Sequence, residues 1–97
     1  MSPETKILKT MRQHTYDLKA YGVKKVGLFG SFARSSWSAK SDIDILVEFS
    51  HGSKTFDNYM DLKFFLEKLF HRKVDLVIKD ALKPRIKGRI LSEVKYA

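Results

Sequence analysis

Residues 42–49 begin with a strict alternation of acidic and aliphatic side chains: Asp42, Ile43, Asp44 and Ile45. Successive side chains of a β-strand point to opposite faces of the sheet. The pattern therefore predicts a strand with two carboxylates on one face and two isoleucines on the other. A strand of this kind requires a sheet with an apolar face and a face that keeps its acids accessible.

Helix-like and strand-like patterns alternate along the rest of the chain. Apolar residues at helical spacing indicate helices, and short β-branched runs indicate strands. We expect helices at residues 4–20, 32–36, 56–71 and 84–94, and strands at residues 23–29, 42–49 and 73–78. This order predicts an α/β (α+β) domain spanning residues 1–97, in which a small mixed sheet of about three strands is flanked by helices.

Composition narrows the class of protein. The 97 residues contain no cysteine, which excludes a disulfide framework and a thiolate zinc site. We find no signal-peptide pattern and no segment apolar enough to span a membrane, so we expect a soluble, cytoplasmic protein. The net charge of +8 suits an anionic partner such as a nucleotide, a nucleic acid or an acidic protein surface, although a solvated basic surface would have the same charge.

The two carboxylates of Asp42 and Asp44 are candidate metal ligands. On a strand their α-carbons lie about 6.5–7 Å apart on one face, where like charges repel one another. A cation between them would relieve this repulsion, and hard oxygen ligands on a rigid strand suit Mg²⁺, with Mn²⁺ as an alternative.

Asp75 lies in a similar setting, between Val74 and Leu76 in the third expected strand. If the second and third strands are neighbours, Asp75 faces the same site as Asp42 and Asp44. Three such carboxylates can hold two metal ions, one to activate an attacking hydroxyl and one to neutralise a triphosphate. Asp75, bound to the first ion only, would then accept the proton of the hydroxyl as general base.

The Gly30-Ser31 turn between a strand and an expected helix is a candidate phosphate-binding element. Glycine lets a backbone approach a phosphate closely, and a helix start offers free N–H groups. The Ser31 hydroxyl can bond a phosphate oxygen, and Arg34 can add a charge-assisted hydrogen bond.

The combination Gly30-Ser31, ten residues, and Asp42-Ile43-Asp44 resembles the signature of the DNA polymerase beta nucleotidyltransferase superfamily. The whole chain, including residues 73–97, is similar to its smallest branch, the minimal nucleotidyltransferases (MNT). The resemblance implies an antitoxin of a HEPN/MNT toxin–antitoxin pair, which transfers AMP from ATP to a tyrosine of a HEPN ribonuclease toxin. Family members often have Arg-Gly after this turn, whereas Arg34 is followed here by Ser35.

The resemblance assigns nucleotide binding to Gly30 and Ser31, both metal ions to Asp42 and Asp44, and the third ligand and base to Asp75. Three other functions stay open: an antitoxin that acts by binding alone, a transferase for small molecules, and a nucleic-acid-binding protein, which the lack of a base-reading motif disfavours.

Trp37 could stack on adenine or pack in its loop. A surplus of aromatic residues at 64–65 could bind a partner or a second copy in a homo- or hetero-oligomer.

Overall fold

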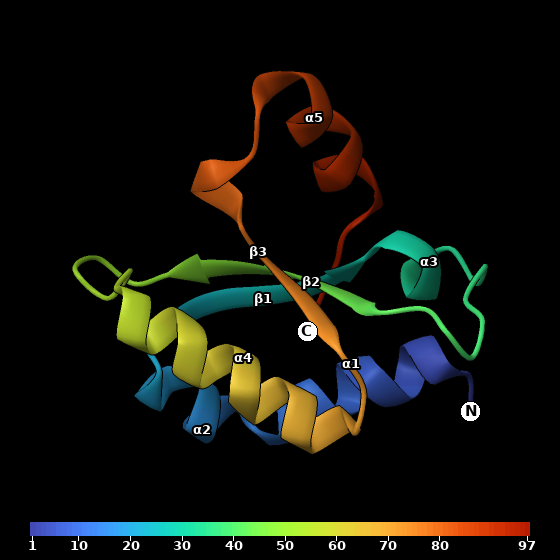
Figure 1. The fold of residues 1–97 in the computed structure, drawn as a ribbon, viewed down its shortest axis with the longest axis horizontal. Coiled ribbons are helices and arrows are strands. Elements are labelled where there is room, and N and C mark those ends of the chain that lie inside the picture. The colour runs from blue at the N-terminus through green and yellow to red at the C-terminus, as the bar shows by residue number, and fades with distance from the viewer.

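The computed structural model describes all 97 residues as a sheet between two unequal helical layers (Figure 1). Its helices are α1 (Pro3–Gln13), α2 (Thr15–Ala20), α3 (Gly30–Ala33), α4 (Phe56–Phe70) and α5 (Pro84–Glu93), with a 3₁₀ turn at Lys79–Ala81. Its strands are β1 (Val23–Phe29), β2 (Ile43–Phe49), β3 (Val74–Ile78) and β4 (Lys95–Tyr96). The predicted class, a mixed sheet flanked by helices, is confirmed.

The sheet has the order β3-β2-β1-β4, with one strand more than the three predicted. β1 runs antiparallel to β2, and β2 runs parallel to β3. The additional strand, β4, consists of two residues that pair with Gly27 and Leu28 of β1. A strand of two residues has no alternation to detect, so the sequence pattern could not predict it.

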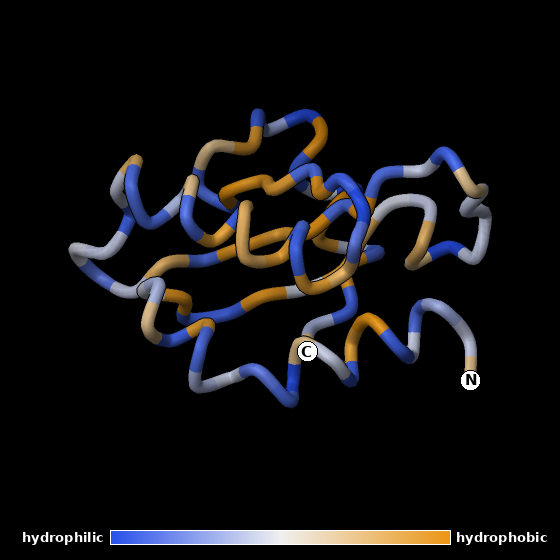
Figure 2. The backbone as a smooth tube through the Cα atoms, turned by 60° about the horizontal axis from the view of Figure 1, so that its bottom comes forward, coloured by the Kyte–Doolittle hydropathy of each residue, from blue (hydrophilic) through white to orange (hydrophobic).

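One face of the sheet is covered by α1, α2 and α4 and holds the main hydrophobic core (Figure 1). The side chains of Ile43, Ile45 and Val47 point to this face and are at most 2% exposed. The acid and isoleucine alternation therefore separates the two faces of β2 as predicted. In Figure 2, hydrophobic residues recur along the strands.

The opposite face is covered in part by α5. Ile90 of this helix packs against Phe29 and Leu46, and the three form a second, smaller buried cluster. Leu46 and Asp44 are two residues apart on β2 and share this face. α5 therefore covers the apolar half of the face on which the carboxylates lie, and it leaves the acidic half open.

Several helix boundaries differ from the prediction. The helix expected at residues 4–20 is two helices separated at His14, whose Nδ1 lies 2.9 Å from the carbonyl oxygen of Thr10. The short helix begins at Gly30 rather than at residue 32.

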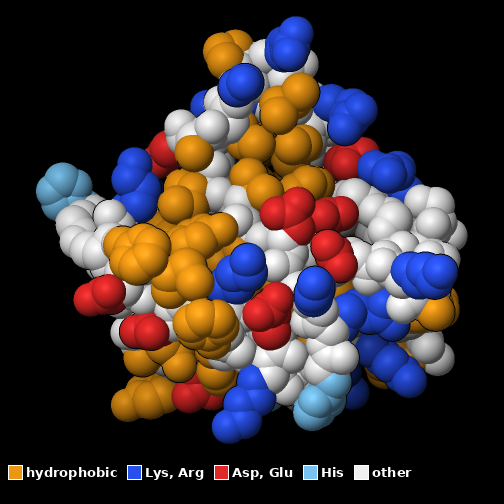
Figure 3. Space-filling model, in the orientation of Figure 1, with side chains coloured by type: hydrophobic (Ala, Val, Ile, Leu, Met, Phe, Trp, Pro, Cys, Tyr) orange, Lys and Arg blue, Asp and Glu red, His pale blue; other side chains and the backbone are white.

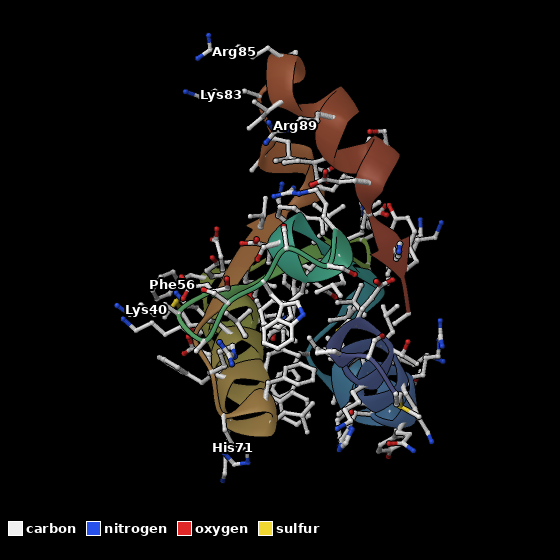
Figure 4. All side chains as sticks on the ribbon, turned by 90° about the vertical axis from the view of Figure 1, so that its right-hand side faces the viewer. Lys40, Phe56, His71, Lys83, Arg85 and Arg89 are labelled. Carbon is white, nitrogen blue, oxygen red and sulfur yellow. The ribbon has the colours of Figure 1, made fainter.

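None of the helices combines the length and apolar character that crossing a membrane requires. Three basic side chains of the α5 region, Lys83, Arg85 and Arg89, extend into solvent on one side (Figure 4).

Candidate active site

The three predicted carboxylates lie together at one end of the sheet. Asp44 on β2 is the direct partner of Asp75 on the parallel strand β3. Asp42 lies just before β2 and shares the face of Asp44 because the two are separated by one residue. Asp42 and Asp75 are exposed, whereas Asp44 is partly buried between its neighbours. Acidic side chains gather near the middle of one face of the molecule, with Lys and Arg around them (Figure 3).

The ionisation of Asp44 reflects this crowding. Burial is the largest cause, followed by the negative charges of Asp75 and Asp42, and together they raise the pKa of Asp44 from 3.8 to about 6. Arg34 acts in the opposite direction and lowers it. The site therefore concentrates negative charge at a position where water cannot fully compensate it.

Gly30 lies directly against this cluster. It follows Phe29, which pairs with Asp44 across β1 and β2, and it begins α3 with a φ of +73°. A Cβ atom at this position would clash with the Asp44 carboxylate. Glycine is thus required here both for its left-handed backbone conformation and for the close approach of the turn to the carboxylates.

Ser31 is partly buried, directly after Gly30 in the first turn of α3. The backbone N–H groups of a first helical turn have no partner within the helix. Arg34, at the end of α3, donates from Nη1 to both carboxylate oxygens of Glu93, at 3.1 and 3.2 Å. The structure therefore brings Gly30, Ser31 and Arg34 together beside the carboxylates, and it adds Glu93 to the group.

The loop between the turn and Asp42 is held by packing. Trp37 stacks on Phe32 with ring centroids 5.6 Å apart, so its ring packs within the loop region, one of the two roles considered for it. The guanidinium of Arg72 lies over the ring of Phe32, the residue on which Trp37 stacks. Arg72 also donates to the carbonyl oxygens of residues 39 and 41. Ser35, the residue after Arg34, has a φ of +59°. That value is in the left-handed region, which glycine adopts more readily than serine.

The carboxylates have donor atoms that suit a divalent cation. The carboxylates offer hard oxygen atoms and carry a mutual repulsion that a cation would remove, which suits Mg²⁺. They do not converge on one point as a group of three ligands. Mg²⁺ is commonly bound by one or two carboxylates together with water and substrate oxygens, so Asp42 and Asp44 would be the protein ligands of such an ion.

The chain matches a known protein family over nearly all of its length. The model of the nucleotidyltransferase domain matches residues 5–97. The chain belongs to the nucleotidyltransferase domain family. Enzymes of this family transfer nucleotidyl groups.

Two relatives support the same assignment. A Methanocaldococcus jannaschii protein named as a protein adenylyltransferase is 42% identical over 98 residues, covering 99% of each chain. The protein adenylyltransferase MntA of Thermococcus cleftensis is 40% identical over 76 residues, covering 78% of this chain and 76% of that protein.

Solved structures show the same fold. A minimal nucleotidyltransferase has a TM-score of 0.74 at 34% identity, covering 91% of this chain and 93% of its own. A complex of a tri-AMPylated Shewanella oneidensis HEPN toxin with its MNT antitoxin has a TM-score of 0.59 at 22% identity, covering 96% of this chain and 66% of that one. The predicted resemblance to minimal nucleotidyltransferases is confirmed.

Two residues of this region, Arg72 and Glu93, were not predicted from the sequence. Arg72 donates to the loop before Asp42. Glu93, the last residue of α5, accepts a hydrogen bond from the backbone of the glycine turn. Neither forms a motif with the residues it contacts. Glu93 is 63 residues from Gly30 in the sequence, so only the folded topology reveals the contact.

Proposed function

We propose that the chain is a metal-dependent protein adenylyltransferase that transfers AMP from ATP to a tyrosine hydroxyl of a cognate HEPN toxin, and so acts as its antitoxin. The observation that carries the proposal is the close packing of the Gly30 turn against Asp44, with Asp42 and Asp75 alongside. This arrangement supports a site in which groups suited to phosphate lie beside carboxylates suited to a metal ion. The relatives named as protein adenylyltransferases support AMP as the transferred group.

Each residue has a separate role in the proposed reaction. The Gly30 turn lies against the phosphates of ATP, and Ser31 binds a phosphate oxygen with Arg34 beside it. Asp42 and Asp44 would hold Mg²⁺, with Asp75 as a third ligand. Two bound Mg²⁺ ions would supply charge neutralisation of the triphosphate and a lowered pKa of the attacking hydroxyl. Asp75 accepts the tyrosine proton while the tyrosine oxygen forms a bond to the α-phosphorus. The bond from that phosphorus to the bridging oxygen breaks, and pyrophosphate leaves.

The acceptor is proposed to be a protein because this small domain leaves the carboxylates accessible on one side of α5. Asp42 and Asp75 are exposed, so an acceptor side chain carried by another protein can reach them. The complex of an AMPylated HEPN toxin with an MNT antitoxin supports a toxin of that class as the partner. The proposal places the reaction in the cytoplasm, where ATP is available. The expectations of a homo- or hetero-oligomer and of no direct nucleic-acid binding stay predictions.

The test separates catalysis from binding. A candidate HEPN-domain toxin is incubated with ATP, Mg²⁺ and either the wild type or the variant Asp42→Ala/Asp44→Ala, and the mass of the HEPN protein is measured. We expect adenylyl groups on its tyrosine with the wild type only. If the variant still neutralises the toxin fully in cells, the chain acts as a catalytically silent binding protein. Turnover of a small hydroxylated acceptor without any protein would instead favour a small-molecule transferase.

A further inference from the structure

Glu93 connects the end of α5 to the turn that the proposed function assigns to nucleotide phosphate. The backbone N–H of Gly30 donates to Glu93 Oε1 at 3.2 Å. Arg34 Nη1 donates to Oε1 at 3.1 Å and to Oε2 at 3.2 Å. The Glu93 carboxylate therefore binds both the backbone of the turn and the guanidinium of Arg34.

The remaining donors of Arg34 stay available to a ligand. A guanidinium has five N–H donors in one plane, and the bonds to Glu93 use Nη1 alone. The side chain of Arg34 is 52% exposed, against 19% for Glu93. Because the group is planar, fixing one of its nitrogens sets the direction in which the others point.

The residues on either side of Glu93 in the chain are fixed by packing and by strand pairing. Ile90, three residues earlier, is 6% exposed and packs against Phe29, the residue before Gly30. Lys95, two residues later, pairs with Leu28 of β1. Glu93 is therefore held at the turn by its neighbours, which distinguishes it from a mobile anion that a phosphate could easily displace.

We propose that Glu93 is a positioning residue for nucleotide binding, which fixes the Gly30 turn and directs the free donors of Arg34 towards a phosphate of ATP. The proposal rests on the proposed function, because it requires that the turn binds a nucleoside triphosphate. Glu93 itself does not touch the nucleotide. Its carboxylate acts through Gly30 and Arg34.

The matched control is Glu4, because its ion pair with Lys95 has nearly the same exposure. The side chains of Lys95 and Glu4 are 51% and 18% exposed, and their atoms Nζ and Oε1 lie 2.5 Å apart. Neither residue contacts the glycine turn. Glu4→Gln and Glu93→Gln thus each remove one carboxylate charge from a similar ion pair, and only the second acts on the proposed phosphate site.

The experiment measures the Kd of Mg-ATP by titration calorimetry, the KM and kcat of AMP transfer, and the Tm. We expect Glu93→Gln to weaken Mg-ATP binding roughly three- to tenfold and to raise KM more than it lowers kcat, as for loss of a partly exposed charge-assisted contact. Glu4→Gln should leave Kd and KM unchanged. Both variants should lower the Tm by similar small amounts.

A double variant tests whether Glu93 acts through Arg34. Arg34→Ala should weaken Mg-ATP binding, and adding Glu93→Gln should weaken it little further, because the group that Glu93 positions is already gone. Equal or tighter Mg-ATP binding by Glu93→Gln would overturn the inference, as would effects of the two substitutions that multiply. If the wild type itself binds no Mg-ATP and transfers no AMP, the proposed function fails as well. That result is seen in the wild type, so it differs from the two outcomes that would overturn the role of Glu93 alone.

Discussion

Replacing Asp44 with Asn is expected to stabilise the metal-free protein at neutral and alkaline pH. Its pKa in the folded protein is raised from 3.8 to about 6 by burial and by the charges of Asp75 and Asp42. A carboxyl group with a raised folded-state pKa favours folding while it is protonated. Its ionisation therefore costs the fold nothing below about pH 4, and the full cost is present above about pH 6.

The shift of about two pKa units, at about 1.4 kcal/mol each, sets an upper limit of about 3 kcal/mol on this cost. Asp44 is partly exposed and coupled to two other carboxylates, so we expect a gain in unfolding free energy of about 1–2 kcal/mol for Asp44→Asn at pH 8. For a domain of this size, that gain raises the Tm by roughly 5–10 °C.

The assay is thermal unfolding followed by circular dichroism in EDTA at pH 4, 6 and 8. The Tm difference between Asp44→Asn and wild type should be near zero at pH 4 and largest at pH 8. Asp61→Asn, at an exposed position on α4, serves as the control and should change the Tm little at any pH. A wild type that is as stable as Asp44→Asn at pH 8, or more stable, would refute the reasoning from carboxylate repulsion.

Three further substitutions test the backbone and the packing around the site. Ser35→Gly should raise the unfolding free energy in urea by about 0.5–1 kcal/mol, because it removes the left-handed strain at a φ of +59°; a loss of stability would contradict this. Gly30→Ala should lower stability by more than about 1 kcal/mol and reduce AMP transfer more than tenfold, because its Cβ would displace Asp44; unchanged transfer would be inconsistent with the packing. Tyr59→Phe should cost about 1 kcal/mol through loss of the 2.7 Å hydrogen bond to the Leu76 carbonyl, while the KM for ATP stays constant; a shifted KM would show that this bond matters to the site.

The local pattern of the sequence predicted the parts of the structure that depend on short-range order. The alternation in β2 set which face is buried, and the order of helices and strands set the architecture. Because Asp42 and Asp44 are two apart on a strand, their common face followed from strand geometry. The proximity of Asp75 required only that β2 and β3 be neighbours, which they are.

The features that were missed depend on contacts between distant segments. β4 pairs with β1 through two residues, which is too short for any periodic signal. Glu93 reaches Gly30 because α5 packs across the sheet, and no local pattern marks that contact. The break between α1 and α2 at His14 interrupts an apolar stripe that continues on both sides, so the stripe predicted one helix.

We propose that the site formed by the glycine turn and its neighbouring carboxylates catalyses transfer of AMP to a tyrosine. This proposal is tested most directly with ATP labelled at the α-phosphate, Mg²⁺ and a candidate HEPN-domain toxin. With the wild type, we predict label on the HEPN protein at tyrosine and release of pyrophosphate, and with Asp42→Ala/Asp44→Ala or without Mg²⁺ we predict neither. Label that appears equally with that variant, or no label with the wild type, would contradict the account.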